Sequence, residues 1–239
     1  TSIGESHLEK LKSIDGVLKE KMSLFDFVSR KSTSEKNCFY IKSGKLEKIN
    51  EQPSYHSIIP GVTLNKRSNQ AFTLSYHSED ILLENNYLTG DYNFYNLALS
   101  AVTSLEFGLS LKTVEIMATK FRPSASRSEW LNFQSAKVFC DFYNANPTSM
   151  INAIDAFSSE CEGKEDNCLY ILGDMYELGE SSSMFHEKVG KHLHANNIKR
   201  VIFVGEYRDS YEKGFGGKAI KYESSSDFKL KDYISNEIN

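Results

Sequence analysis

Two polar segments that each follow a short apolar run hold the residues best suited to chemistry. Residues 141–150 read Asp-Phe-Tyr-Asn-Ala-Asn-Pro-Thr-Ser-Met, and residues 173–179 read Gly-Asp-Met-Tyr-Glu-Leu-Gly. Their carboxylates and amides could exchange hydrogen bonds with a polar substrate. The apolar runs at residues 138–140 and 169–172 predict buried strands. Each polar segment therefore begins where a predicted strand ends.

A helix is expected after each polar segment, and a third strand is expected at residues 201–205. The helical positions are Met150, Ile151, Ile154 and Phe157 after the first segment, and Met184, Val189 and Leu193 after the second. Strand, helix, strand, helix, strand predicts an α/β fold with a mainly parallel sheet and right-handed crossovers. Ligands bind beyond the carboxyl ends of the strands in such sheets, so we expect a site at Asp141, Asp174 and Gly205.

The composition agrees with a soluble intracellular protein or a piece of one. The 239 residues have room for one large or two modest domains, and 40% of them are hydrophobic. A net charge of -4 offers no basic surface for nucleic acid, and no apolar run approaches the roughly 20 residues of a membrane span. The cysteines form no Cys-x-x-Cys pair and two lie in predicted strands, so we expect reduced core thiols. They are Cys38, Cys140, Cys161 and Cys168.

A Pro/Ser stretch at residues 121–126 predicts a boundary between domains at residues 1–121 and 122–239. The first predicted helix of the chain carries a lysine, Lys21, on its apolar face. The apolar positions of that face are Ile14, Val17, Leu18, Phe25 and Val28. Periodicity alone favours a lysine stem that packs on this face while the ammonium reaches water. His7, in a preceding loop, reads by itself as a structural hydrogen-bonding residue.

Both polar segments resemble motifs of the Mur ligases of peptidoglycan synthesis. The C-terminal domain of one member type carries Asp-x-Tyr-Asn-Ala-Asn-Pro-x-Ser-Met and then Gly-Asp-Met-x-Glu-Leu-Gly, with a His a few residues on, here His186. Both motifs are present without gaps, and the resemblance continues upstream through residues 3–9, Lys21 and residues 90–96. It implies that residues 1–121 are the second half of a central ATPase domain. Residues 122–239 would then be a Rossmann-like C-terminal domain.

Some parts of the family pattern have no match. No Gly-x-x-Gly-Lys-Thr phosphate loop occurs in these residues, and no Lys-Gly-Ser segment follows the helix predicted at residues 227–238. We therefore expect a fragment that lacks the UDP-sugar-binding domain and the phosphate loop, is cut at its C-terminal end, and is inactive alone. Ser2 and Ser23 also replace a usual Asn and Glu, which bears on the local geometry of the site.

The resemblance implies an ATP-dependent ligase of the bacterial cytoplasm, acting as a monomer without nucleic-acid or membrane partners. It would join D-alanyl-D-alanine to UDP-N-acetylmuramoyl-tripeptide through an acyl phosphate, with no protein nucleophile. His7 and a carbamylated Lys21 would hold Mg2+, and Arg127 would meet the terminal phosphate of ATP. An anion on Lys21 suits the metal, because carbon dioxide adds to a neutral amine and the carbamate product is negative.

The remaining roles also come from the resemblance. Asn93 and Asn96 would read the adenine of ATP, although from the residues alone they could instead cap a helix, as could Asp91. Asp141 would bind the ribose of ATP. The residues near the incoming dipeptide would be Asn144, Asn146, Glu177 and His186. From the residues alone, the two amides could merely fix the turn before a proline, and the histidine could be an exposed helix residue.

Two other functions remain open at the level of sequence. One is another Mur-type or folylpolyglutamate-type amino-acid ligase, against which the Asp-Met-x-Glu-Leu-Gly part of the second motif argues. The other is a non-catalytic module that binds a dipeptide, for which the unmatched phosphate loop is the support.

Overall fold

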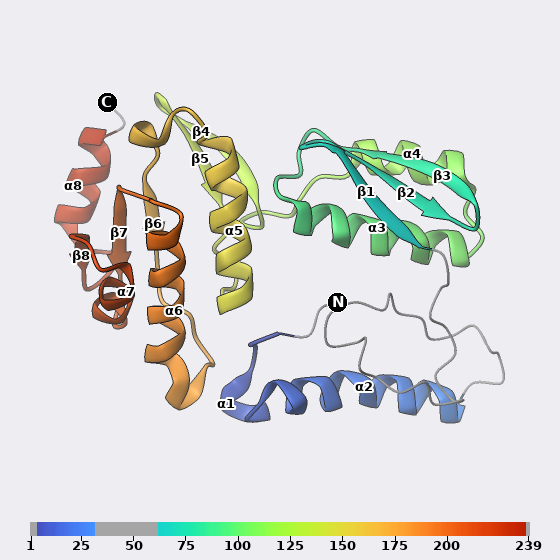
Figure 1. Ribbon diagram of the computed structural model, residues 1–239, viewed down its shortest axis with the longest axis horizontal. Helices are drawn as coiled ribbons and strands as arrows, with labels where there is room; N and C mark the ends of the chain where they lie inside the picture. The colour runs from blue at the N-terminus through green and yellow to red at the C-terminus, as the bar shows by residue number, and fades with distance from the viewer. Residues whose placement is uncertain (1–3, 32–61, 238–239) are drawn as a thin grey trace. The chain divides into compact units, whose positions relative to one another are not determined.

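A computed structural model describes residues 4–31 and 62–237 of the protein (Figure 1). The contacts between residues divide the chain into two units. The first holds residues 11–122 together with residues 1–4, and the second holds residues 123–239 together with residues 5–10. The short N-terminal segment at residues 5–10 thus belongs by its contacts to the second unit, which the sequence did not indicate.

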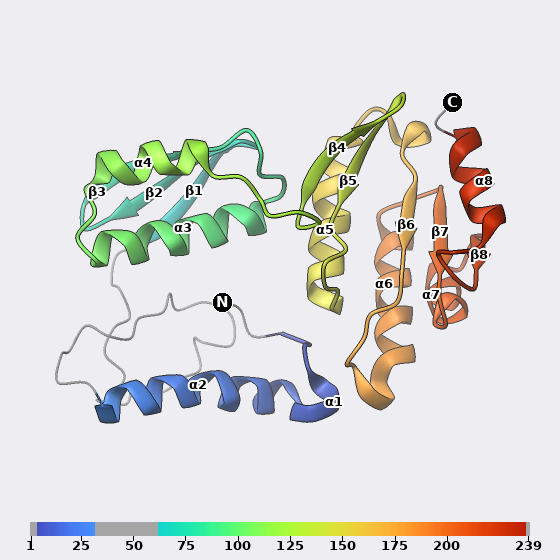
Figure 2. The ribbon, with the colours of Figure 1, turned by 180° about the vertical axis from the view of Figure 1, so that it is seen from behind.

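The first unit contains an antiparallel three-stranded sheet in the order β1-β2-β3, packed against two helices (Figure 2). In β3, Ile81 and Leu83 are buried while their neighbours are exposed, the alternation expected of a strand with one buried face. The elements are α2 (Ile14–Lys31), β1 (Thr63–Ser68), β2 (Ala71–Tyr76), β3 (Glu79–Glu84), α3 (Asp91–Glu106) and α4 (Leu111–Lys120). The single turn α1 (Leu8–Leu11) precedes them in the sequence, and its residues 8–10 belong to the second unit.

Helix α2 confirms the first helix predicted from the sequence. Val17 is fully buried, whereas Ile14, Leu18 and Lys21 are half-buried. The side chains of Phe25 and Val28, the last two positions of the predicted stripe, lie outside the described residues.

The second unit is built on a parallel sheet in the order β6-β7-β8. Every residue of the central strand β7 is buried, because helices cover both faces of the sheet. Residues of α5, α6 and α7 share one core with Val201 and Phe203, while Leu230 of α8 packs with Ile202 and Val204. The elements are α5 (Pro147–Glu160), β6 (Tyr170–Leu172), α6 (Ser182–Ala195), β7 (Val201–Val204), α7 (Arg208–Phe215), β8 (Ile220–Tyr222), α8 (Phe228–Glu237) and the 3-10 turns η2 (Glu165–Asn167) and η3 (Gly179–Ser181).

One predicted strand has a different partner. Residues 138–140 belong to β5 (Ala136–Cys140), which pairs with β4 (Glu129–Phe133) as an antiparallel hairpin rather than extending the parallel sheet. The two-residue turn between them has Gln134 at φ 52°, the positive angle that tight hairpin turns require. Trp130 and Phe139 of the hairpin pack against Phe157 of α5. The strands and helices from residue 147 to residue 204 follow the predicted order.

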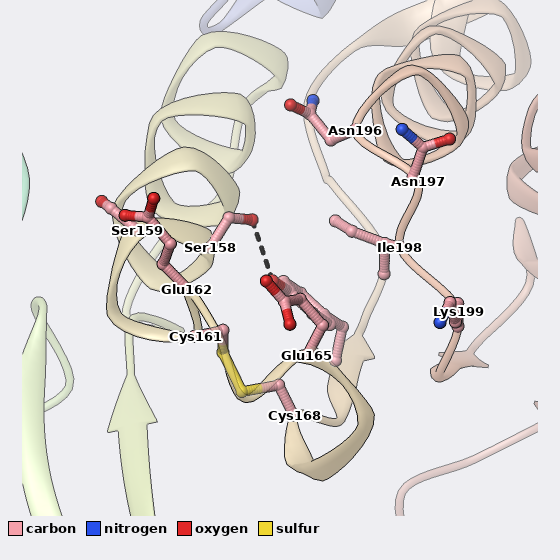
Figure 3. Close-up of a pocket in the computed structure, with 11 residues that line it drawn as sticks. Ser158, Ser159, Cys161, Glu162, Glu165, Cys168, Asn196, Asn197, Ile198 and Lys199 are labelled. Atoms are coloured by element: carbon pink, nitrogen blue, oxygen red, sulfur yellow. Dashed lines mark hydrogen bonds between the residues drawn. A yellow bond between two sulfur atoms is a disulfide. The ribbon is translucent and has the colours of Figure 1, made fainter.

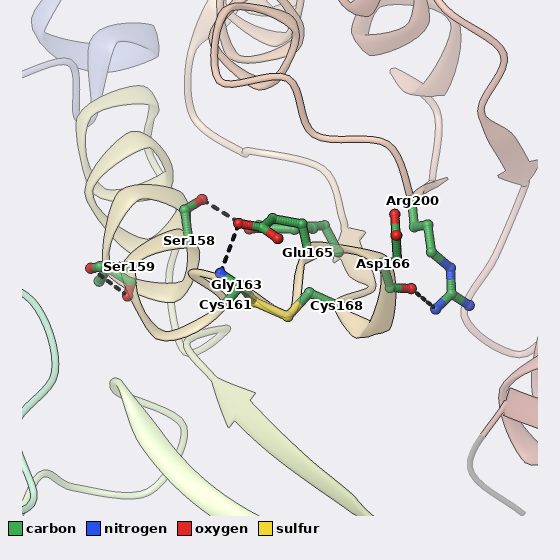
Figure 4. Close-up of a disulfide and its surroundings, with 10 residues drawn as sticks. Ser158, Ser159, Cys161, Gly163, Glu165, Asp166, Cys168 and Arg200 are labelled. Atoms are coloured by element: carbon green, nitrogen blue, oxygen red, sulfur yellow. Dashed lines mark hydrogen bonds between the residues drawn. A yellow bond between two sulfur atoms is a disulfide. The ribbon is translucent and has the colours of Figure 1, made fainter.

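The expectation of reduced thiols is wrong for two cysteines. Cys161, at the end of α5, and Cys168, just before β6, form a disulfide with Cα atoms 6.2 Å apart (Figure 4). The chain turns back through η2 between them, which brings the two sulfur atoms together. Cys140 is free and buried, and Cys38 lies outside the described residues. Within residues 4–31 and 62–237, no helix has the length and apolar character needed to cross a membrane.

Candidate functional site

The second polar segment follows β6 and is tied to the end of β7. The carboxylate of Asp174 accepts hydrogen bonds from the backbone N–H groups of Glu206 (2.8 Å) and Tyr207 (3.0 Å). Gly205 packs against this carboxylate with φ 121°, and a Cβ added at Gly205 would overlap it. The Tyr211 hydroxyl donates to the carbonyl oxygen of Gly173 at 2.7 Å. Asp174 and Gly205 therefore meet at the strand ends as predicted, but the Asp174 carboxylate accepts hydrogen bonds from the backbone.

His186 lies in the core behind this segment, with no exposed surface. Its Nδ1 donates to the Ser182 carbonyl oxygen at 2.6 Å, and its Nε2 accepts the Met175 backbone N–H at 2.9 Å. The ring stacks on Tyr207, with ring centres 4.3 Å apart. Burial lowers the pKa of His186, against the opposing effects of the Ser182 carbonyl and Asp174. The alternative of an exposed helix residue is wrong, and both ring nitrogens are engaged within the fold.

Tyr176 and Glu177 are what residues 173–179 present to the outside. Tyr176 is 74% exposed, and the Glu177 side chain is 52% exposed. The Glu177 carboxylate pairs with Nδ1 of His7, and the Glu177 carbonyl accepts the Glu9 N–H at 3.0 Å. The structure thus brings together two predicted site residues, one from each end of the chain.

The first polar segment is held against the loop that precedes β4. Asp141 accepts the backbone N–H of Ser128 at 3.1 Å, and the Ser126 carbonyl accepts the N–H groups of Phe142 and Tyr143, both at 3.1 Å. The guanidinium carbon of Arg127 lies 4.0 Å from the centre of the Tyr143 ring, a cation–π contact. The hairpin places Glu129 opposite Cys140, so the predicted residues Arg127 and Asp141 reach the same end of it.

Asn144 and Asn146 differ although they are two residues apart. The Asn146 side chain accepts the Ser149 N–H at 2.9 Å, and the Ser149 hydroxyl accepts the Asn146 N–H at 2.9 Å. This reciprocal capping box, with Pro147 in the first turn, starts α5. Asn144 is exposed. One amide builds the helix start, and the other faces outward.

The remaining predicted residues belong to the first unit. Asn93 donates to the Thr89 carbonyl oxygen at 2.8 Å, and Asn96 is exposed on α3. The capping alternative is not what the structure has: the N-cap of α3 is Gly90, with no side-chain cap bond. Asp91 pairs with Lys66 at 2.7 Å.

Metal binding is a separate question from this geometry. Among the described residues, no three His, Cys, Asp or Glu side chains gather in a way that could hold a metal ion. A magnesium site on this chain would therefore need a ligand of another kind, such as a carbamate on Lys21, or groups beyond these residues. The orientation of His7 fits such a site, because its Nδ1 contacts a carboxylate and its Nε2 remains for a ligand.

A cavity of about 290 Å³ lies at the other end of the parallel sheet (Figure 3). It is lined by the disulfide, by Glu162 and Glu165, and by Ile198 and Lys199, which precede β7. These positions are at the amino ends of β6 and β7. The cavity is therefore separate from the residues at the strand ends that carry the motifs.

Comparison with known proteins shows similarity to one enzyme family. Residues 126–229 match the family described as Mur ligase, glutamate ligase domain. The UDP-N-acetylmuramoyl-tripeptide--D-alanyl-D-alanine ligase of Buchnera aphidicola subsp. Baizongia pistaciae is 25% identical, over 100% of this chain and 52% of its own length. The ligase of the same name from Bacillus subtilis is also 25% identical, over 86% of this chain and 45% of its own length. Residues 126–229 therefore carry the domain that this family model describes.

Solved structures of Mur ligases share the fold. MurF from Acinetobacter baumannii has a TM-score of 0.77 at 18% identity, over 99% of this chain and 52% of that one. MurF ligase from Thermotoga maritima in complex with ADP has a TM-score of 0.73 at 19% identity, over 99% of this chain and 54% of that one. The predicted α/β Mur ligase fold is confirmed. The chain spans about half the length of the curated relatives that it matches.

Sequence reasoning missed the residues that pack behind this candidate site. Tyr207 and Tyr211 enclose the imidazole of His186, and Glu5 accepts a hydrogen bond from Thr148. Gly205 after an all-apolar strand was the one available signal, since glycine at a strand end often marks a close approach. Nothing in the spacing of Glu5 and Thr148 pointed to their contact.

Proposed function

We propose that this protein carries the acceptor half of an ATP-dependent ligase that joins D-alanyl-D-alanine to UDP-N-acetylmuramoyl-tripeptide, in the bacterial cytoplasm. The supporting observation is the state of the two motifs. Each is fixed to backbone at a strand end, while Arg127, Asn144, Tyr176 and Glu177 stay accessible beside them. Groups held this way are oriented before a ligand arrives, which lowers the entropic cost of reaction. The curated relatives bear the name of this reaction.

The nucleotide would be bound by four of the predicted residues. Asn93 and Asn96 offer amide donors and acceptors suited to an adenine edge, and Asp141 offers a carboxylate oxygen to the ribose. Arg127 offers a planar cation to the terminal phosphate. Its present contact with the Tyr143 ring leaves the guanidinium exposed, so that role needs no buried pair to be broken.

Magnesium would be held by His7 and by Lys21 as its carbamate. When bound, the ion would neutralise charge on the phosphates as phosphoryl transfer proceeds. Lys21 is half-buried on α2. His7 is accessible, with 54% of its side chain exposed.

The chain's own groups would act by placement rather than by covalent attack. Arg127 would stabilise charge as the peptide carboxylate takes the phosphoryl group, which activates it for attack by the dipeptide amine. Asn144 and Glu177 would face the incoming dipeptide. Asn146 and His186 would hold the loops that present them, the first by capping α5 and the second through the Met175 N–H. We propose a monomer.

The test is phosphate release from ATP by the complete gene product that contains this chain. Release should require both UDP-N-acetylmuramoyl-tripeptide and D-alanyl-D-alanine. Lys21→Ala should nearly abolish it and be partly rescued by a small carboxylate, whereas Lys19→Ala, at an exposed position on the same helix, should leave it unchanged. Release that is independent of D-alanyl-D-alanine, or supported equally by a single amino acid, would overturn the assigned acceptor.

A further inference from the structure

The segment at residues 5–10 is bound to the second polar segment, although they lie at opposite ends of the sequence. The Glu9 N–H donates to the Glu177 carbonyl oxygen at 3.0 Å, and the Glu177 carboxylate contacts Nδ1 of His7. Gly179 approaches the same segment, since a Cβ added there would lie 3.5 Å from the Glu9 Cα atom. Backbone and side chain of one residue, Glu177, thus hold the histidine segment.

This segment is also anchored on either side of His7. The carboxylate of Glu5 accepts the Thr148 hydroxyl at 2.6 Å and pairs with Lys188 at 3.2 Å. The Glu5 side chain is only 14% exposed. Leu8 packs against the core formed by α5, α6 and the parallel sheet. His7 is therefore presented by a segment fixed at several points and not by a loose tail.

Both residues of the contact have unusual backbone angles. His7 has φ 54° and Glu177 has φ 62°, in the left-handed region that side chains other than glycine rarely adopt. Such conformations persist where the surroundings impose them, and they cluster at functional sites. The two side chains meet although about half of each is exposed. A pair so open to water adds little to folding stability, so its consequence is orientation.

The chemistry of the contact decides which ring nitrogen can bind a ligand. A carboxylate can only accept, so the neutral imidazole beside it carries its proton on Nδ1 and keeps the Nε2 lone pair. Carboxylates placed behind histidine ligands fix the tautomer and ring orientation and raise the basicity of the ligating nitrogen. We propose that Glu177 is a positioning residue that holds His7 in the Nδ1–H tautomer with Nε2 directed to a divalent cation.

This inference rests on the proposed function only for the identity of the cation. It also gives Glu177 a different task from contact with the incoming dipeptide. Its two parts, the tautomer and the metal affinity, can be measured separately and without turnover.

The first experiment is NMR of the ring nitrogens in this 239-residue chain, labelled with 15N at its six histidines, at a pH where imidazoles are neutral. His7→Gln assigns the His7 signals. We expect the Nδ1–H tautomer in the wild-type chain and a mixture of tautomers in Glu177→Ala. Glu180→Ala removes an exposed carboxylate three residues on and should leave the His7 signals unchanged. Circular dichroism verifies that each variant is folded. A Glu177→Ala chain that keeps the wild-type tautomer would overturn the proposal.

The second experiment is titration of the same chains with Mn2+ in bicarbonate buffer, read as paramagnetic broadening of the His7 signals. Glu177→Ala should weaken Mn2+ binding about 10-fold or more, as loss of an outer carboxylate does elsewhere, and Glu180→Ala should not. Broadening that is equal in the wild type and Glu177→Ala would overturn the positioning role. Failure of phosphate release by the complete gene product, with the tautomer and Mn2+ results as expected, would instead count against the proposed reaction.

Discussion

The two motif loops sit at strand ends of the same unit, but they are held in different ways. In the loop after β5, the side chains that bond to backbone are the loop's own: Asn146 caps the following helix, and Asp141 accepts the Ser128 N–H. The loop after β6 uses its own Asp174 in the same way, but it is also held by side chains from outside it, since His186 accepts the Met175 N–H and the Tyr211 hydroxyl donates to the Gly173 carbonyl. Substitutions within the first loop should therefore destabilise it, whereas the second loop should also be destabilised by substitutions of the residues that pack against it.

The comparison also separates the residues of each motif by task. In each loop some polar side chains are used on backbone and others stay exposed. Asn146 and Asp174 belong to the first group, and Asn144 and Glu177 to the second. A motif read from sequence mixes these tasks, because the loop must be built before it can bind.

The largest loss of stability is expected from Gly205→Ala, which changes a residue that packs against the second loop. The new Cβ would overlap the Asp174 carboxylate at a φ of 121°. Overpacking costs about 1–3 kcal/mol and the backbone strain a similar amount, so we expect a loss of roughly 4 kcal/mol in the free energy of unfolding. Urea denaturation measures it. Gly173→Ala is the matched control: no atom lies within 4 Å of its added Cβ, and its stability should stay close to that of the wild type.

The next effect is expected from His186→Ala, which leaves the Met175 N–H and the Ser182 carbonyl without their side-chain partner. A buried group left unsatisfied costs about 1–3 kcal/mol, so a loss near 3 kcal/mol in unfolding free energy is expected, with increased amide exchange at residues 173–179. His194→Ala, on an exposed position of the same helix, should change neither quantity. Unaltered amide exchange at residues 173–179 would show that this loop does not depend on its contact with His186.

Asn146→Ala tests the loop after β5, in which Asn146 itself caps the following helix. Loss of a helix N-cap costs about 1 kcal/mol, and we expect that loss here together with weaker helicity at the start of α5. Asn144→Ala changes the same side chain two residues earlier, at an exposed position, and should leave stability unaltered within about 0.5 kcal/mol. Thermal melts of the two variants side by side decide the matter. Equal destabilisation by the two variants would show that Asn146 contributes no more to stability than the exposed Asn144.

The last prediction concerns how the free energy of unfolding depends on pH, through His186 behind the second loop. Burial lowers the pKa of His186 in the folded state, so below about pH 6.5 the unfolded chain takes up a proton that the folded chain does not. Stability from this residue is fully present above that pH and falls as the pH drops toward the lowered pKa, by at most about 1.4 kcal/mol per pH unit. Urea denaturation of the wild type and His186→Gln between pH 7.5 and pH 5, roughly, should show the difference narrowing at the acidic end. A constant difference would mean that folding does not change the pKa of His186.

The sequence predicted the elements around β6 and β7 because each strand is a short apolar run, and residues at roughly helical spacing lie between the two runs. It did not predict the partner of β5. A run such as Val138 to Cys140 reads the same in a hairpin and in a parallel sheet, and the choice depends on the preceding strand and its turn. The antiparallel sheet of the first unit was not identified either, since β1 is almost entirely polar and exposed.

The site was predictable only in part, for similar reasons. Asp141 could be expected at a strand end, but the burial of His186 could not be predicted, because its neighbours on α6 do not form a continuous apolar stripe. The contact of His7 with Glu177 joins residues at opposite ends of the sequence and leaves no local pattern. The disulfide was missed because a spacing of seven residues becomes a bond only once α5 and β6 are placed.

The bond between Cys161 and Cys168 closes a small ring of exposed residues, 162–167, that includes Lys164. Trypsin cleaves after lysine, and exposed loops are where proteases act first. A cut after Lys164 would therefore release no fragment: the nicked protein would migrate as one band on a gel and separate into two only when a reductant is added.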